Sequence, residues 1–195
     1  MKPAQLKIIQ AVGDLAIPLL GYFFWNWDFY FILLFYILDL LVSSAFTFIK
    51  VHQVNKHRNT IHFSWKWLLL TILMVSVSFY LIFQAMPMID PEFDFLRDTW
   101  NFLAYEEMGI AQGILLLPLL IYGGYMQYKM QFLMNGKFRA VSQEEVWKQH
   151  FTTLLLVLAI TGIMLAVSTQ VVFPHIVYIL GLIFGATAYR FLVTR

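Results

Sequence analysis

The feature that most constrains this chain is a set of long, almost uncharged apolar segments. Of its 195 residues, 61% are hydrophobic and only 12% are charged, whereas soluble domains carry about 25% charged residues. A water-soluble domain of this length has too little interior to bury so much apolar surface. Membrane β-barrels are built from strands of alternating polarity, whereas these segments are continuously apolar. The sequence therefore predicts an all-α polytopic membrane protein, a helical bundle whose helices cross the bilayer.

Six segments approach the roughly 20 apolar residues that a membrane-spanning helix needs. We expect one transmembrane domain over residues 1–195, with an outer amphipathic helix over about 91–104 and a cytoplasmic helical extension over about 143–150. The six expected spans cover about residues 8–25, 29–49, 67–86, 109–128, 151–171 and 175–192.

The basic residues predict the orientation of these spans. With six spans, every Lys and Arg except Arg97 falls at one membrane surface, and the loops at the other surface are acidic. Cytoplasmic loops are enriched in Lys and Arg, so both termini are expected in the cytoplasm. Five or seven spans would break this segregation. The residues on the basic side are Lys2, Lys7, Lys50, Lys56, Arg58, Lys66, Lys129, Lys137, Arg139, Lys148, Arg190 and Arg195.

Several helix ends are also predicted from local signals. Asp90 is a good N-cap and Pro91 suits the first position of a helix. Ser142 and Glu145 have the spacing of a capping box, and Gly136 is expected to end the helix before it. The aromatic residues near span ends are interpreted as interfacial belts. They are Tyr22, Trp25, Trp27, Tyr30, Trp65 and Trp67.

The second expected span places the carboxylate of Asp39 in the middle of an apolar segment. Such a group is costly at membrane depth unless it is protonated, paired or hydrated, so it marks a candidate functional site. A structural role, in which Asp39 bonds another helix, is an equal alternative. Side chains at helical spacing extend a polar stripe from Asp39 toward the cytoplasmic end. They are Tyr36, Ser43, Thr47 and Lys50.

A second carboxylate, Asp14, lies in the first expected span. Pro18 removes the hydrogen bond to the carbonyl of Asp14, and a freed carbonyl beside a carboxylate suits a proton or a cation. We expect Asp14 to support Asp39, or to pair with Lys7 in a structural role. Gln112 is a third polar residue at depth and is assigned to the same proton or ion pathway.

Small residues at four-residue spacing predict close contacts between helices. The residues assigned to helix packing are Pro18, Gly21, Gly109, Gly113, Gly181, Gly185 and Ala188.

The sequence excludes several classes of chemistry. It contains no cysteine, so disulfides and thiolate ligands are ruled out. The small net charge of +2 gives no reason to expect nucleic acid. His52, His57 and His62 do not share a helix face, so their basic loop is expected to attract anionic lipid rather than to bind a metal. No metal or other cofactor is predicted.

An enzyme is the third-ranked class. Gly13-Asp14 is similar to the Gly-Asp element of intramembrane aspartic proteases, but Ala11 replaces the first glycine of the fuller Gly-x-Gly-Asp pattern, and a second catalytic motif is missing.

Three motifs in the first fifty residues resemble a family of uncharacterised prokaryotic integral membrane proteins, a domain of unknown function. They are the segment 13–21 (Gly-Asp-Leu-Ala-Ile-Pro-Leu-Leu-Gly), the turn Trp25-x-Trp27-Asp28, and Tyr36-Ile-Leu-Asp39. Asp39 stands where the family often has glutamate, and the aromatic pair before it is incomplete. The resemblance implies a multi-pass protein of the prokaryotic cytoplasmic membrane and brings no known activity.

These observations favour a proton- or cation-conducting channel or transporter that uses Asp39, with Asp14 in support. The alternative is a non-catalytic membrane subunit or scaffold that binds a partner membrane protein, or a second copy of itself, through its aromatic outer end and glycine faces.

Overall fold

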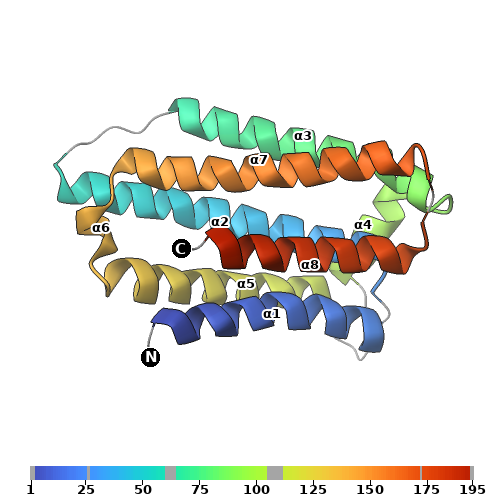
Figure 1. Cartoon of the computed structure of the whole chain (residues 1–195), viewed down its shortest axis with the longest axis horizontal. Helices are drawn as coiled ribbons and strands as arrows, with labels where there is room; N and C mark the ends of the chain where they lie inside the picture. Colours follow the sequence, from blue (N-terminus) through green and yellow to red (C-terminus); the bar gives the residue numbers. More distant parts are fainter. Residues whose placement is uncertain (1–2, 26, 60–64, 105–111, 172, 194–195) are drawn as a thin grey trace. The chain divides into compact units, whose positions relative to one another are not determined.

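The computed structural model describes residues 3–25, 27–59, 65–104, 112–171 and 173–193, and the side chains of 3–11, 14, 103–104, 112–115, 175 and 186–193 are outside the description. The described chain is all-helical (Figure 1). Its elements are α1 (Pro3–Phe24), α2 (Phe29–His57), α3 (Trp65–Ile89), α4 (Phe95–Ala104), α5 (Gln112–Gln127), the π-helix η1 (Tyr128–Leu133), α6 (Lys137–Ala140), α7 (Gln143–Ser168) and α8 (His175–Val193).

Within the described residues, three helices are long and apolar enough to cross a membrane: α2, α3 and α7. Shorter apolar segments, Leu15–Phe24 and Ile176–Gly185, lie in α1 and α8. The helix α2 continues past the apolar segment 29–49 to His57. The helix α7 begins at Gln143, where the helical extension was expected, and ends at Ser168.

The chain forms two compact units. Unit 1 contains Met1–Ile37, Asp94–Leu116 and Phe173–Arg195, and unit 2 contains Leu38–Phe93 and Leu117–Val172. The helices α2 and α5 each contribute residues to both units.

Unit 1 is organised around the first turn of α2. Asp28 begins this helix, because its Oδ1 accepts a hydrogen bond from the backbone N–H of Phe31 at 2.7 Å, which is the usual role of an N-cap side chain. The α1 and α8 helices pack against each other in the same unit. The core of the unit contains a run of buried α2 residues and two isoleucines of α8, Ile179 and Ile183.

Each residue that enters α2 contacts a different element of unit 1. The indole of Trp27 covers Gly21 of α1, and the Phe29 ring lies 5.7 Å from that of Tyr178 in α8, centroid to centroid. The Tyr30 hydroxyl is 2.8 Å from Oγ1 of Thr99 in α4. The start of α2 therefore joins α1, α4 and α8.

Two residues that we interpreted as interfacial belts are core residues instead. Trp27 and Tyr30 are each only 2% exposed. The two rings therefore do not face lipid, since an aromatic ring with one polar atom suits a buried site with a partner as well as it suits the membrane surface. Trp65, by contrast, is exposed.

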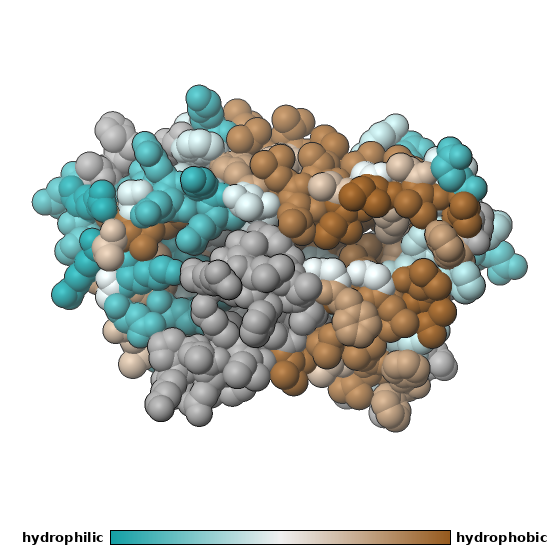
Figure 2. All heavy atoms as spheres, in the orientation of Figure 1, coloured by the Kyte–Doolittle hydropathy of each residue, from teal (hydrophilic) through white to brown (hydrophobic). Residues whose placement is uncertain are grey.

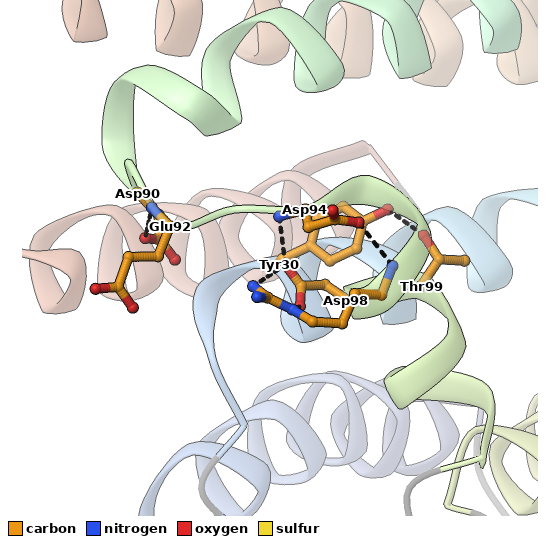
Figure 3. A network of polar contacts seen from close by, with 7 residues as sticks. Tyr30, Asp90, Glu92, Asp94, Asp98 and Thr99 are labelled. Carbon is orange, nitrogen blue, oxygen red and sulfur yellow. Dashed lines mark hydrogen bonds and ion pairs between the residues drawn. The ribbon is translucent and has the colours of Figure 1, made fainter.

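The amphipathic helix α4 begins at Phe95, later than the expected start at Pro91. Asp90 does not cap it, because its Oδ1 accepts from the nearby Glu92 N–H at 3.0 Å and closes a local turn. The cap is Asp94, whose Oδ1 accepts from the Arg97 N–H at 2.9 Å (Figure 3). Both aspartates are suitable N-cap residues, and in the structure Asp94 caps α4.

Unit 2 contains the packed pair α3 and α7 and a group of residues that we call the Trp147 cluster. Its buried members are Val51, Val54, Phe132, Val146 and Trp147. Aromatic side chains surround them: Trp67 stacks on Trp147 with ring centroids 5.7 Å apart, and Phe48 meets Trp147 edge-on at 5.0 Å. The cluster thus joins α2, α3, η1 and α7.

The start of α7 confirms the predicted capping box. The Ser142 side chain accepts from the Glu145 N–H at 3.2 Å, and the Glu145 carboxylate accepts from the Ser142 N–H at 3.0 Å. Gly136 has φ of 64° and stands between η1 and α6, where a left-handed conformation favours glycine.

Candidate functional site

The polar stripe on α2 runs along the edge of the buried face of this helix. Asp39 and Lys50 are half-buried, Thr47 is buried and Ser43 is exposed. The residues next to Asp39 on the buried side, among them Leu40, are core residues. The carboxylate of Asp39 is therefore neither sealed in the interior nor fully exposed on the surface of unit 2.

Two hydroxyl groups of this helix, those of Ser44 and Thr47, are satisfied by its own backbone. Thr47 Oγ1 donates to the carbonyl of Ser43 at 3.0 Å, and Ser44 Oγ donates to the carbonyl of Leu40 at 2.7 Å. Such bonds to the carbonyl four residues earlier allow hydroxyl side chains inside an apolar helix without another partner. Tyr36, at the other end of the stripe, is half-buried, and its ring packs edge-on against Phe35 at 5.4 Å.

The Lys50 end of the stripe meets a second polar group in unit 2. His150 of α7 is only 6% exposed, and the Lys50 ammonium interacts with it electrostatically. His150 Nε2 lies 3.5 Å from Oγ1 of Thr71 in α3, which is itself buried. Three helices therefore bring Lys50, Thr71 and His150 into one neighbourhood.

The hydrogen bonds around Thr71 restrict the chemistry of His150. The Thr71 hydroxyl donates its single hydrogen to the carbonyl of Trp67 at 2.9 Å. Its oxygen can then only accept from His150, so the contact requires the tautomer with hydrogen on Nε2. His150 Nδ1 is then the acceptor nitrogen of the ring.

Trp147 adds one unsatisfied donor to this region. The side chain is 3% exposed, and its Nε1–H has no hydrogen-bond partner among the described residues. The ring of Trp147 packs at 5.9 Å from that of His150. An orphaned buried N–H is uncommon and costs roughly 1–3 kcal/mol, so the surrounding aromatic packing must offset it.

Hydrophilic and apolar side chains separate along unit 2. Figure 2 shows hydrophilic residues gathered where α2 ends and α6 and α7 begin, and apolar residues along α3 and α7 beyond them. Several apolar side chains of α3, including Leu69 and Leu73, are more than half exposed. An apolar exterior of this kind is suited to lipid rather than to water.

Some predicted site residues lie outside the described part of the chain. These are the side chains of Asp14 and Gln112, the whole of Gly109, and the surroundings of Gly113 and Ala188. The expected approach of Asp14 to Asp39 therefore stays a prediction.

The remaining residues assigned to helix packing fall into two classes. Pro18 is fully buried, and Gly21 lies directly under the Trp27 ring, so both residues take part in packing at this end of α1. A Cβ placed on Gly181 or Gly185 would meet no described atom within 4 Å.

The sequence contained a signal for His150 that we did not use. The buried side of this part of α7 is formed by residues at spacings of one, three and four. They are Val146, Trp147, His150 and Leu154. A histidine on an otherwise apolar helix side indicates a buried polar contact. We missed this pattern because the predicted extension ended at residue 150 and the predicted span began at residue 151, so the four residues were divided between two segments.

Among the residues that the structure describes, no group of three His, Asp or Glu side chains is placed to hold a metal ion. No protein-family model matches the chain, and no curated protein or solved structure shows significant similarity to it. The resemblance of residues 13–50 to a prokaryotic family therefore stays a prediction. The structure itself defines an all-helical chain with apolar helices suited to a membrane.

Proposed function

We propose that this chain is a multi-pass protein of the cytoplasmic membrane, with six spans and both termini in the cytoplasm. The length and composition of α2, α3 and α7 support the membrane location. The hydrophilic end of unit 2, where exposed Lys56 and Arg58 lie, supports the orientation.

The orientation is tested with single cysteines, which this cysteine-free chain can carry without background labelling. Lys56→Cys should resist an impermeant maleimide in intact cells and react after lysis, whereas Glu92→Cys should react in both cases. Both positions are exposed in the structure. The reverse pattern would overturn the topology.

Within this membrane protein, we propose that the stripe on α2 conducts protons, with Asp39 as the titrating group. The half-buried position of Asp39 at the edge of the buried face is the observation that carries the proposal. Carboxylates at membrane depth are typical of proton and ion pathways. From Asp39 the stripe continues through Thr47 to Lys50, whose amine offers a further proton-binding group toward one membrane surface.

The charge of Lys50 favours a proton over a metal cation. An ammonium group repels a cation that approaches along the same helix face, and the repulsion is strong where the dielectric constant is low. A proton can instead pass between Asp, Lys and water by changing hydrogen bonds.

Proton flux into liposomes that contain the purified protein tests this function. Asp39→Asn should reduce the flux to that of protein-free liposomes, and Asp39→Glu should keep it, because glutamate retains a titrating carboxyl group. Glu144→Gln is the matched control, since Glu144 is exposed in the first turn of α7. Equal flux through the wild type and Asp39→Asn would remove Asp39 from the pathway.

A second candidate function is that of a membrane subunit that binds a helix of a partner protein. It is favoured by the open side of α8, where Gly181 and Gly185 lie away from buried Ile179 and Ile183. A side chain added at either glycine would meet no described atom of this chain. Small residues permit a second helix to approach closely.

Purification in mild detergent tests this second function. The wild type should retain a stoichiometric partner, and Gly181→Leu should lose it while keeping the same thermal stability. Val177→Leu, an exposed apolar change on the same helix, is the control. A wild-type chain that purifies alone would rule the partner out.

A further inference from the structure

The short helix α4 presents three different sides. At about 100° per residue, Phe95, Thr99 and Phe102 share one side and Leu96 and Trp100 a second, roughly 100° further round. Arg97, Asn101 and the aspartates Asp94 and Asp98 occupy the rest of the circumference. An apolar arc and a polar arc therefore divide the helix.

The first side fixes the rotation of α4 in unit 1. Thr99 Oγ1 is 2.8 Å from the hydroxyl of Tyr30, as Figure 3 shows. The ring of Phe102, which is buried, meets that of Phe31 edge-on at 5.5 Å. A polar and an aromatic contact, three residues apart on α4, prevent the helix from rolling about its axis.

The second side is left uncovered by the described chain. Leu96 is 78% exposed and Trp100 is 70% exposed. They lie four residues apart, so they form one ridge on the helix surface. On the polar side Asp94, Arg97 and Asn101 are also exposed, and Arg97 forms an ion pair with the half-buried Asp98 at 2.9 Å.

The docking partners of α4 place it at the end of a membrane-crossing helix. Tyr30 and Phe31 lie in the first turn of α2, one of the helices able to cross the bilayer. A helix bound at that level lies at the depth of the lipid headgroups. An amphipathic helix at this depth buries its apolar ridge in the boundary between headgroups and acyl chains.

We propose that α4 is an interfacial anchor whose Leu96 and Trp100 insert into the lipid monolayer at the α2 N-terminal end. Trp100 suits this location, since tryptophan concentrates at the membrane–water interface. The acidic residues of the polar arc disfavour an anionic surface, so the fitting partner is a zwitterionic lipid such as phosphatidylcholine. The inference rests on α2 crossing the membrane, as in the proposed function.

The size of the ridge favours lipid over a protein partner. A stable protein interface buries about 800 Å² on each side and uses roughly 20–30 residues. Two side chains flanked by Asp and Arg fall far below that area. A lipid surface has no such requirement, because it adapts to whatever apolar group enters it.

Depth measurements with nitroxide labels test the anchor in phosphatidylcholine nanodiscs. Single cysteines at Leu96→Cys and Trp100→Cys should give labels that collide with oxygen and are protected from a water-soluble nickel chelate. Asn101→Cys, on the polar arc of the same helix, should show the opposite preference. Because positions 96, 100 and 101 are exposed, none of these labels disturbs the packing.

A fourth label separates failure of the anchor from failure of the membrane topology. Leu41→Cys lies in the apolar middle of α2 at an exposed position. If it contacts lipid while positions 96 and 100 contact the nickel chelate, the anchor is disproved and the spanning helix stands. If all four contact the chelate, both are disproved. Shielding of positions 96 and 100 from both reagents would indicate a protein partner and also overturn the proposal.

Discussion

The indole of Trp27 lies directly over Gly21, and the backbone of the same pair is hydrogen-bonded. The carbonyl of Gly21 accepts from the N–H of Trp27 at 2.9 Å and from that of Trp25 at 3.1 Å. The ring occupies the place where a side chain on Gly21 would stand. This contact ends α1 and directs the chain into α2.

Substitution of Gly21 should therefore destabilise the protein. In Gly21→Ala the new methyl group overlaps the Trp27 ring, and overpacking of a core costs about 1–3 kcal/mol. We expect the thermal midpoint to fall by about 2–4 °C per kcal/mol, measured by circular dichroism in detergent. Gly13→Ala, on the same helix, is the control, because its Cβ meets no described atom within 4 Å. Equal midpoints for the two variants would contradict the Trp27 contact.

Two adjacent glycines of α5 provide a second comparison. A Cβ on Gly124 would lie 2.6 Å from the ring of Phe46 in α2, whereas one on Gly123 would meet nothing described within 4 Å. Gly124→Ala should lower the free energy of unfolding by about 1–3 kcal/mol. Gly123→Ala should leave it unchanged or raise it by about 0.5–1 kcal/mol, since alanine favours a helix over glycine. If Gly123→Ala lowered the free energy of unfolding more than Gly124→Ala, then Gly123 rather than Gly124 would face α2.

Loss of the capping box should loosen the start of α7. Ser142→Ala removes the side chain that accepts from the Glu145 N–H, and such changes cost about 1 kcal/mol. Thr152→Ala is the control, because its exposed hydroxyl bonds only the carbonyl of Lys148 in its own helix. Hydrogen exchange at residues 143–146 should accelerate in the first variant alone.

The unpartnered indole predicts an unusual mutational series at Trp147. Trp147→Ala should cost about 3–5 kcal/mol, as for other large buried residues. Trp147→Phe should cost much less, because it removes a buried N–H that has no described partner and whose burial is itself unfavourable. Unfolding midpoints of the two variants test this difference. If phenylalanine cost as much as alanine, the N–H would have to make a favourable contact in solution.

The features that the sequence predicted well are those with a local physical signal. The capping box at Ser142, the glycine stop at Gly136 and the apolar length of the long helices each depend on a few neighbouring residues. The start of α4 was missed because Asp90 and Asp94 carry the same signal, and only the tertiary fold selects between them.

The parts of the site that depend on distant contacts were not predictable in this way. Thr71 and His150 lie in different helices, and no pattern within either helix indicates that the two side chains meet. The π-helix η1 was also missed, because a single wide turn of six residues leaves no periodic trace in the sequence. Asp39 is a candidate from sequence because a carboxylate in an apolar helix is costly at membrane depth, and its role in a proton pathway stays a prediction.

The length of α2 has a consequence for how the two ends of this helix are stabilised. Its 29 residues extend about 43 Å at 1.5 Å per residue, whereas the hydrocarbon layer is about 30 Å thick. In the proposed topology Phe29 lies at one membrane surface, so Val51 and Val54 lie at or past the other and the Trp147 cluster packs outside the hydrocarbon layer. Expulsion of water drives that packing and gives it a heat-capacity signature, whereas contacts between helices in mid-bilayer have no water to expel. Urea should therefore disrupt the packing of the side chains around Trp147, while the helices within the membrane stay associated.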